Sequence, residues 1–95
     1  MTEMAKVKIT FYGALARAIK EKEAELEASN IKEALNKVEI KYGGDFRQKI
    51  QDDIGNLRRF INIFVNGKDI RFLDLFNTPL KEEDEVAIIP AVSGG

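Results

Sequence analysis

Apolar and polar residues alternate along residues 6–12, with Val7, Ile9 and Phe11 on one side and lysine, threonine and tyrosine on the other. Such alternation predicts a strand with one buried face. Residues 23–28 alternate again, with alanine and leucine set against three glutamates. We expect this second strand to form a hairpin with the first, although its Glu-Ala composition would also suit a helix.

The apolar spacing changes to a helical period at residues 31–42, where apolar residues recur every three or four positions. Asn30, followed three residues later by Glu33, predicts a capping box at the start of this helix. A glycine pair follows and predicts its end. Residues 14–19 predict a short helix or turn, and Asp45 is expected to cap another short helix.

Three more strands are predicted in the second half of the chain. Residues 60–65 form an apolar run broken only by an asparagine, and residues 68–72 are expected to return beside it. The intervening Asn66-Gly67 pair favours a tight hairpin because both turn positions require positive φ. The last strand is predicted at residues 85–89 and is expected to stop at Pro90, which has no N–H to donate.

This order predicts an α+β fold, in which one main helix packs on one face of a mixed sheet. A chain of 95 residues is expected to form one domain with one core. We place that core at about residues 6–90 and expect a flexible C-terminal tail at residues 91–95. In the irregular segment before the last strand, Leu75, Phe76 and Leu80 are expected to pack against the edge of the core.

Alternation also predicts which residues face away from the helix. In the last strand Val86 and Ile88 should face the core, which leaves Ala87 and Ile89 on the open face. The same reasoning predicts an exposed apolar patch formed by Tyr12, Phe60, Phe64 and Ile89. Patches of this kind often mark a partner surface. Scattered surface aromatics without a role, or a patch covered by a neighbouring segment, remain alternatives.

Charge and composition exclude several classes of function. Lysine plus arginine number 15 and aspartate plus glutamate 16, so a net charge of −1 gives no electrostatic case for nucleic-acid binding. The absence of cysteine and histidine removes disulfides, Cys/His zinc sites and thiol nucleophiles, and makes catalysis by the chain alone less expected. No signal peptide or membrane-length apolar run is seen, so we expect a cytoplasmic protein without membrane contact.

The last five residues are uncharged and end in Gly94-Gly95. Fully extended, they would reach roughly 17 Å, far enough to enter another protein's active site. Two glycines leave a terminal carboxylate unhindered, which suits its activation as an acyl-adenylate followed by capture by a nucleophile. A frayed end or a cloning remnant are the alternatives.

Residues 84–95 read Asp-Glu-Val-Ala-Ile-Ile-Pro-Ala-Val-Ser-Gly-Gly. This stretch resembles the C-terminal signature of the molybdopterin synthase small subunit, the MoaD-like sulfur carriers. The resemblance covers essentially the whole domain, with supporting matches at residues 7–13, 15–17, 65–67 and 78–80. It implies a ubiquitin-like β-grasp fold.

The resemblance also implies the chemistry. An adenylating enzyme of the ubiquitin-activating type would use ATP and magnesium to form a Gly95 acyl-adenylate, and sulfur would replace AMP to leave a thiocarboxylate. Gly94 and Gly95 are then the reacting end. The tail, with Pro90, Val92 and Ser93, would enter a MoaE-like large subunit that builds the pterin dithiolene. The chain itself is expected to bind no cofactor and no metal.

By family position, Tyr12 and Ile89 lie on the apolar surface used against both partners, and alternation adds Phe64 to that surface. The sequence departs from the family in two places. Ala91 stands where the family often has a second proline, and Glu83 stands where a turn glycine is common. Neither departure touches the reacting end.

Other functions stay open at this point. The same tail serves ubiquitin-like protein modifiers of the small archaeal type, in which a lysine amine attacks the activated glycine. The sulfur carrier of thiamine synthesis, a β-grasp binding module with an inert tail, and a stand-alone enzyme are further alternatives. The charged residues Lys20–Lys22, Arg58-Arg59, Lys68-Asp69 and Arg71 are expected to be simply solvated.

Overall fold

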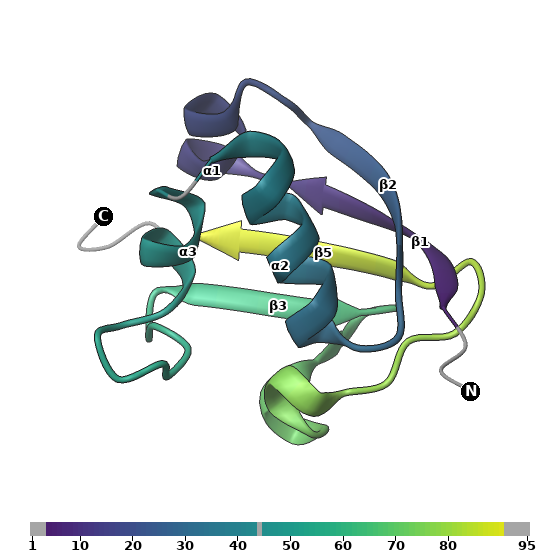
Figure 1. The fold of residues 1–95 in the computed structure, drawn as a ribbon. Helices are drawn as coiled ribbons and strands as arrows, with labels where there is room; N and C mark the ends of the chain where they lie inside the picture. The colour runs from purple at the N-terminus through teal and green to yellow at the C-terminus, as the bar shows by residue number, and fades with distance from the viewer. Residues whose placement is uncertain (1–3, 44, 91–95) are drawn as a thin grey trace.

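The computed structural model describes residues 4–43 and 45–90. Within them, strands form one mixed sheet in the order β2-β1-β5-β3-β4, and helix α2 crosses one face of it (Figure 1). The strands are β1 (Ala5–Phe11), β2 (Glu23–Ala28), β3 (Ile61–Val65), β4 (Lys68–Asp69) and β5 (Glu85–Pro90); the helices are α1 (Gly13–Ile19), α2 (Ile31–Tyr42) and α3 (Asp45–Ile50). The predicted α+β layout is confirmed.

The last strand, β5, occupies the centre of the sheet. It runs parallel to β1, with Ile88 opposite Phe11, and antiparallel to β3, with Ile88 opposite Ile63. The predicted hairpin of β1 and β2 is confirmed as an antiparallel pair. The β3–β4 turn is also as predicted, because Asn66 and Gly67 both have positive φ, 51° and 86°. The end of the chain therefore continues from the middle of the fold.

Helix α2 begins with the predicted cap. The side chain of Asn30 accepts a hydrogen bond from the backbone N–H of Glu33 at 2.8 Å. The Glu33 carboxylate accepts one from the backbone N–H of Ser29 at 2.7 Å, one residue before the expected donor. These two bonds satisfy donors that a helix start would otherwise leave unpaired. They fix where α2 enters the layer above the sheet.

The core lies between α2 and the sheet. Phe11, at the end of β1, packs edge-on against Tyr42 and Phe46, with ring centroids 6.2 and 6.1 Å apart. These contacts join the ends of α2 and α3 to the end of β1. The other core residues are apolar and buried, among them Val7, Ile9, Leu15, Ile31, Ala34, Leu35, Val38, Ile50, Ile61, Ile63, Val65, Ile70, Leu80, Val86 and Ile88.

Three local predictions were wrong. The return strand predicted at residues 68–72 is only Lys68–Asp69, because the chain turns into a 3-10 helix at Ile70–Phe72. The last strand includes Pro90, which lies opposite Ile61 at the end of the ladder, where a missing N–H is tolerated. Leu75 does not pack on the core edge but is 46% exposed, in a second 3-10 helix at Leu75–Asn77.

Two arginines also differ from expectation. Arg71, expected to be solvated, donates hydrogen bonds to the backbone oxygens of Arg58 and Ile61, both at 2.9 Å, and to Oδ1 of Asn62 at 3.1 Å. Arg58 itself donates from Nε to the backbone oxygen of Gln48 at 2.6 Å. These bonds tie the loop before β3 to α3 on one side and to the 3-10 helix after β4 on the other.

Candidate functional site

The face of β5 that points away from α2 carries apolar side chains. Ala87 and Ile89 are half-buried on this side, whereas Val86 and Ile88 are buried under the helix, as alternation predicts. Phe64 of β3 is also half-buried and lies across from Ala87. The predicted face of each of these residues is therefore confirmed.

Phe64 and Ile89 both line an open depression of about 550 Å³. Its lining residues come from β3, β5 and the turn after β3: Phe64, Asn66, Gly67, Glu85, Ala87 and Ile89. Apolar side chains form its floor, while polar side chains lie at the hairpin end. Such a surface fits an apolar protein segment better than a small charged ligand.

The end of β5 is flanked from both sides by aromatic residues. Tyr12 directly follows β1, donates its backbone N–H to the Ile88 oxygen at 3.2 Å, and is 45% exposed. On the other side Phe60, 54% exposed, precedes Ile61, the residue opposite Pro90. Tyr12, Phe60 and Ile89 thus lie at the end of the sheet where β5 stops, whereas Phe64 lies toward the β3–β4 turn and shares one depression with Ile89.

Pro90 lies against the turn between β1 and α1. Gly13 in that turn has a φ of 57°, and a Cβ built on it would lie 3.3 Å from the Cγ atom of Pro90. The hydrogen bond from Tyr12 to Ile88 ties the same turn to β5. The point at which the chain leaves the sheet is thus defined by contacts with a neighbouring segment.

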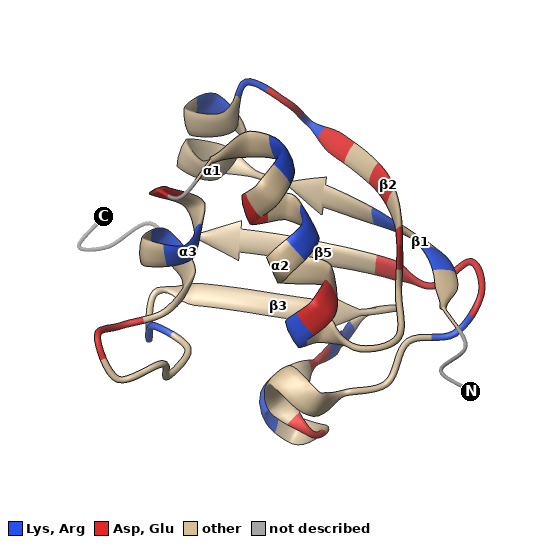
Figure 2. Ribbon diagram, in the orientation of Figure 1, with Lys and Arg blue, Asp and Glu red and all other residues tan. Residues whose placement is uncertain are grey.

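Strands β1 and β2, which form the other half of the sheet, carry several charged residues (Figure 2), and the burial pattern of both strands places them on the open face. Lys8 pairs with Glu23 at 3.3 Å and Lys6 with Glu25 at 3.9 Å, all well exposed to solvent. The hydrogen bond and negative charge of Glu23 raise the pKa of Lys8 above its ordinary 10.5. Strand β3, by contrast, carries no charged residue. The open face is therefore divided into a charged half and an apolar half.

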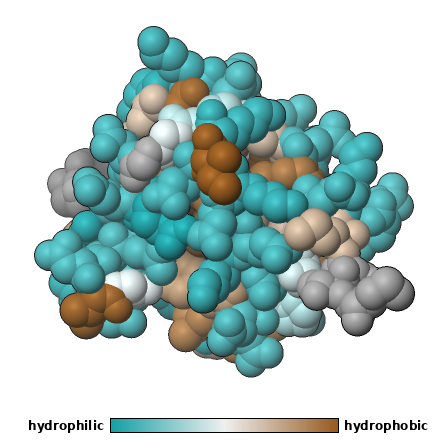
Figure 3. Space-filling model, viewed as in Figure 1, coloured by the Kyte–Doolittle hydropathy of each residue, from teal (hydrophilic) through white to brown (hydrophobic). Residues whose placement is uncertain are grey.

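Among the described residues, the outside of α2 carries no comparable patch. Viewed from that side, the surface is mainly hydrophilic, with isolated hydrophobic residues (Figure 3). Ile40 on α2 is 84% exposed and lies among exposed or half-exposed polar neighbours in its helix. A single exposed isoleucine of this kind is ordinary for a protein surface.

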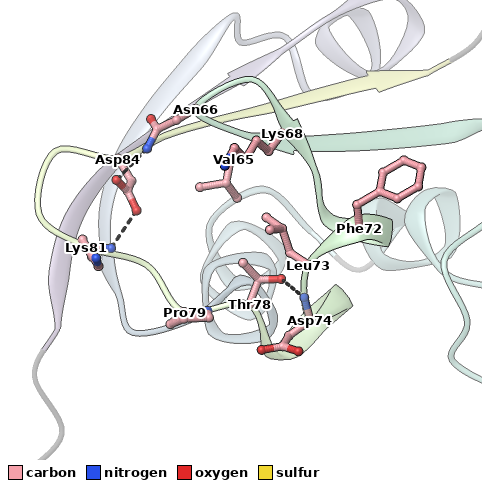
Figure 4. Close-up of a pocket in the computed structure, with 10 residues that line it drawn as sticks. All are labelled: Val65, Asn66, Lys68, Phe72, Leu73, Asp74, Thr78, Pro79, Lys81 and Asp84. Atoms are coloured by element: carbon pink, nitrogen blue, oxygen red, sulfur yellow. Dashed lines mark hydrogen bonds between the residues drawn. The ribbon is translucent and has the colours of Figure 1, made fainter.

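A larger depression, about 650 Å³, lies at the opposite end of β5 (Figure 4). Its polar groups bind each other: Asp84 accepts from Asn66 Nδ2 and from the backbone N–H of Lys81, both at 2.8 Å. In the same depression the Thr78 hydroxyl accepts from the backbone N–H of Asp74 at 3.0 Å. These bonds stabilise turns. The depression is also about 17 Å, the length of β5, from Pro90.

The four predicted tail residues Val92, Ser93, Gly94 and Gly95 lie outside the described residues. Among the residues that the structure does describe, no cluster of three or more acidic side chains is placed to hold a metal ion. None of the described helices is long and apolar enough to cross a membrane. The described part of the site is thus an apolar surface beside the end of a strand.

Sequence reasoning missed the role of Gly13 and of the Arg71–Asn62 pair. Gly13 follows the first predicted strand, and nothing in the neighbouring residues gives a sign of Pro90, which is far away in the sequence. Arg71 was assigned to solvent from its place near a hairpin. Only the fold brings it within hydrogen-bonding distance of Asn62.

A central helix packed on a five-stranded mixed sheet, with the last strand in the middle, defines a ubiquitin-like β-grasp domain. The model of the ThiS family matches residues 9–95, and the chain belongs to that family. Its fold agrees closely with the small archaeal modifier protein 1 of Methanosarcina acetivorans, with a TM-score of 0.82 and 33% identity over 98% of this chain and 99% of that one.

Three further relatives are named as sulfur carrier proteins or as CysO. The sulfur carrier protein CysO of Mycobacterium tuberculosis is 38% identical over 63 residues, which are 64% of this chain and 67% of that protein. The CysO chain in a BexX/CysO complex from Amycolatopsis orientalis has a TM-score of 0.78 and 30% identity, covering 94% of this chain and 99% of that one. Against a curated Archaeoglobus fulgidus relative, the 53 aligned residues span 59% of the relative's length.

Proposed function

We propose that this chain is a sulfur carrier that delivers sulfur from a thiocarboxylate on Gly95, as the small subunit of a molybdopterin synthase. One observation carries the proposal: the strand that leads to the glycine pair is the central strand, and its open side is apolar beside the exit point. A partner that docks on Phe64 and Ile89 would receive the residues after Pro90 directly. The chain's relatives include proteins named sulfur carriers.

The proposed chemistry has two steps. In the first, a carboxylate oxygen of Gly95 attacks the α-phosphorus of magnesium-bound ATP, and pyrophosphate leaves. In the second, hydrosulfide attacks the acyl carbon, AMP leaves, and a thiocarboxylate and a proton result. With no cysteine in the chain, a side chain cannot carry the sulfur as a thiol. In the proposed chemistry the sulfur is therefore carried on the terminal carboxylate of Gly95.

Two partners follow from this proposal. An adenylating enzyme of the ubiquitin-activating type would supply the ATP site, and a MoaE-like large subunit would accept the tail and the sulfur. The apolar depression suits both, because the same exit point must be presented to each in turn. The structure of a BexX/CysO complex from Amycolatopsis orientalis, to which this chain is similar, supports the proposal of a protein partner.

The test is an intact-mass measurement after incubation with the host's adenylating enzyme, magnesium-ATP and sulfide. We expect a gain equal to the mass difference between sulfur and oxygen, which is abolished when Gly95 is deleted. An unchanged mass with an adenylating enzyme shown to be active on another carrier would contradict the proposal. Transfer is then tested by adding the large subunit and pterin precursor and following loss of the gained mass.

A protein modifier is the second candidate, and one observation favours it: the similarity to a small archaeal modifier protein extends over nearly the whole chain. In that case a lysine amine, rather than hydrosulfide, would displace AMP and form an isopeptide bond. Recovery of Gly95 joined to lysines of other proteins would support this function. Thiocarboxylate formation alone is compatible with both functions, so conjugates of Gly95 with lysine side chains must be sought in a separate experiment.

A further inference from the structure

Where β1 passes into α1, Gly13 lies close to Pro90 at the end of β5. Gly13 has a left-handed φ of 57°, and a Cβ there would lie 3.3 Å from Cγ of Pro90 and 3.9 Å from its Cδ. The nearer distance is tighter than most Cβ contacts in proteins, so one of the two segments would have to shift. The other described glycines with positive φ, Gly43, Gly55 and Gly67, have nothing within 4 Å of that position.

Pro90 is poorly able to absorb such a shift within its own side chain. Its ring is closed onto the backbone nitrogen and its φ is held near −65°, so the Cγ atom can move only by a change of ring pucker and not by the rotation that is open to the end of a long side chain. The turn is equally restrained, because Tyr12 donates its backbone N–H to Ile88. A side chain at Gly13 would therefore push on the backbone at the end of β5.

We propose that Gly13 is a positioning residue that sets the direction in which the chain leaves β5 toward a partner's active site. This inference rests on the proposed function, since direction matters only if the residues after Pro90 are delivered to a reacting centre. Reactions between groups held by two proteins are sensitive to displacements of about 1 Å. Docking on Phe64 and Ile89 should be affected less, because the atoms nearest to a Cβ at Gly13 belong to Pro90.

The experiment compares Gly13→Ala with Gly55→Ala in adenylation by the activating enzyme, followed as pyrophosphate release against carrier concentration. Both variants place an alanine at positive φ, so both lose stability, but only the first meets Pro90. We expect kcat to fall about tenfold for Gly13→Ala with KM within about twofold of wild type. Gly55→Ala should change neither value at a temperature where it is folded.

A second pair of variants identifies the contact. Alanine at position 90 has no Cγ, so adding Gly13→Ala to Pro90→Ala should cause little further loss of kcat. An unchanged kcat in folded Gly13→Ala would overturn the inference, and so would a loss of equal size in the Pro90→Ala background. If Gly13→Ala does not fold, Gly13→Asn replaces it, because asparagine tolerates the left-handed region and carries the same Cβ.

Failure of the proposed function gives a different result. A wild-type chain that is not adenylated by an active enzyme contradicts the carrier proposal. The inference is then decided by NMR: Gly13→Ala should shift the Cα and Cγ signals of Pro90 and the amide of Ile89, and Gly55→Ala should leave them unchanged. Unshifted Pro90 signals in Gly13→Ala would overturn it.

Discussion

The two faces of the sheet use the same kind of residue for different purposes. On β5, Val86 and Ile88 are buried beneath α2, at 1% and 0% exposure, and belong to the core. Ala87 and Ile89 alternate with them but face the other way, where no described element covers them fully. Apolar residues along one strand therefore form two surfaces, one that stabilises the fold and one that is left open and that we propose binds a partner.

The largest effect should come from the covered face. Ile88→Ala removes most of a side chain that is fully buried between β1, β3 and the helix layer. Because a cavity remains, the free energy of unfolding should fall by about 3 kcal/mol. Urea denaturation measures it. If the free energy of unfolding fell by less than about 1 kcal/mol, the result would contradict the assignment of Ile88 to the buried face of β5.

The polar edge of the open face should contribute the next largest effect. Arg71→Ala removes hydrogen bonds to Asn62 and to the backbone oxygens of Arg58 and Ile61. The carbonyl oxygens of Arg58 and Ile61 then lose a charged hydrogen-bond donor, so we expect the free energy of unfolding to fall by about 2 kcal/mol. Arg59→Ala, at an exposed neighbouring position, is the matched control and should change stability little. Equal losses in both variants would refute the role assigned to Arg71.

Ile89→Ala should separate binding from stability. Its side chain is half-buried, so the unfolding free energy should fall by less than about 1 kcal/mol, while the Kd for the adenylating enzyme rises about tenfold. The control is Ile40→Ala, which removes the same atoms from the outside of α2, where Ile40 is 84% exposed. Calorimetric titration compares the two variants. A similar increase in Kd for Ile40→Ala would place the docking surface elsewhere.

The smallest effect concerns the charged half of the open face. The hydrogen bond and charge of Glu23 raise the pKa of Lys8 above 10.5 in the folded protein. Stability from this pair is therefore present below that pH and is lost as the pH rises through the folded pKa. Both groups are exposed, so the effect should be small and weaker in salt. An NMR titration should show a lower Lys8 pKa in Glu23→Gln; an unchanged pKa would exclude the pairing.

Local signals predicted most of the fold because each element depends on neighbouring residues. The capping residues of α2, the Asn66-Gly67 turn and the alternation in β3 all act over a few positions. The short β4 could not be predicted, since an apolar residue such as Ile70 suits a strand or a 3-10 turn equally, and the surrounding core selects the turn.

The candidate site was predictable only in part. Alternation placed Phe64 and Ile89 on one face, but the contact between Gly13 and Pro90 joins residues far apart in the sequence and depends on the fold. The sequence likewise does not reveal the backbone conformation of Glu83, which has a φ of 68° in the turn before β5. Glycine adopts positive φ without steric strain, which explains why it suits this position. A single sequence with glutamate there gives no sign of that conformation.

The most direct test of the central claim asks which face receives the partner. Methyl signals of isotopically labelled protein would be recorded with and without the adenylating enzyme. If the partner docks on the open face, the methyl signals of Ala87 and Ile89 should shift or broaden, whereas the methyl signal of Ile40 on α2 should not. Perturbation confined to Ile40 and the helix layer, with Ala87 and Ile89 unchanged, would contradict docking on that face.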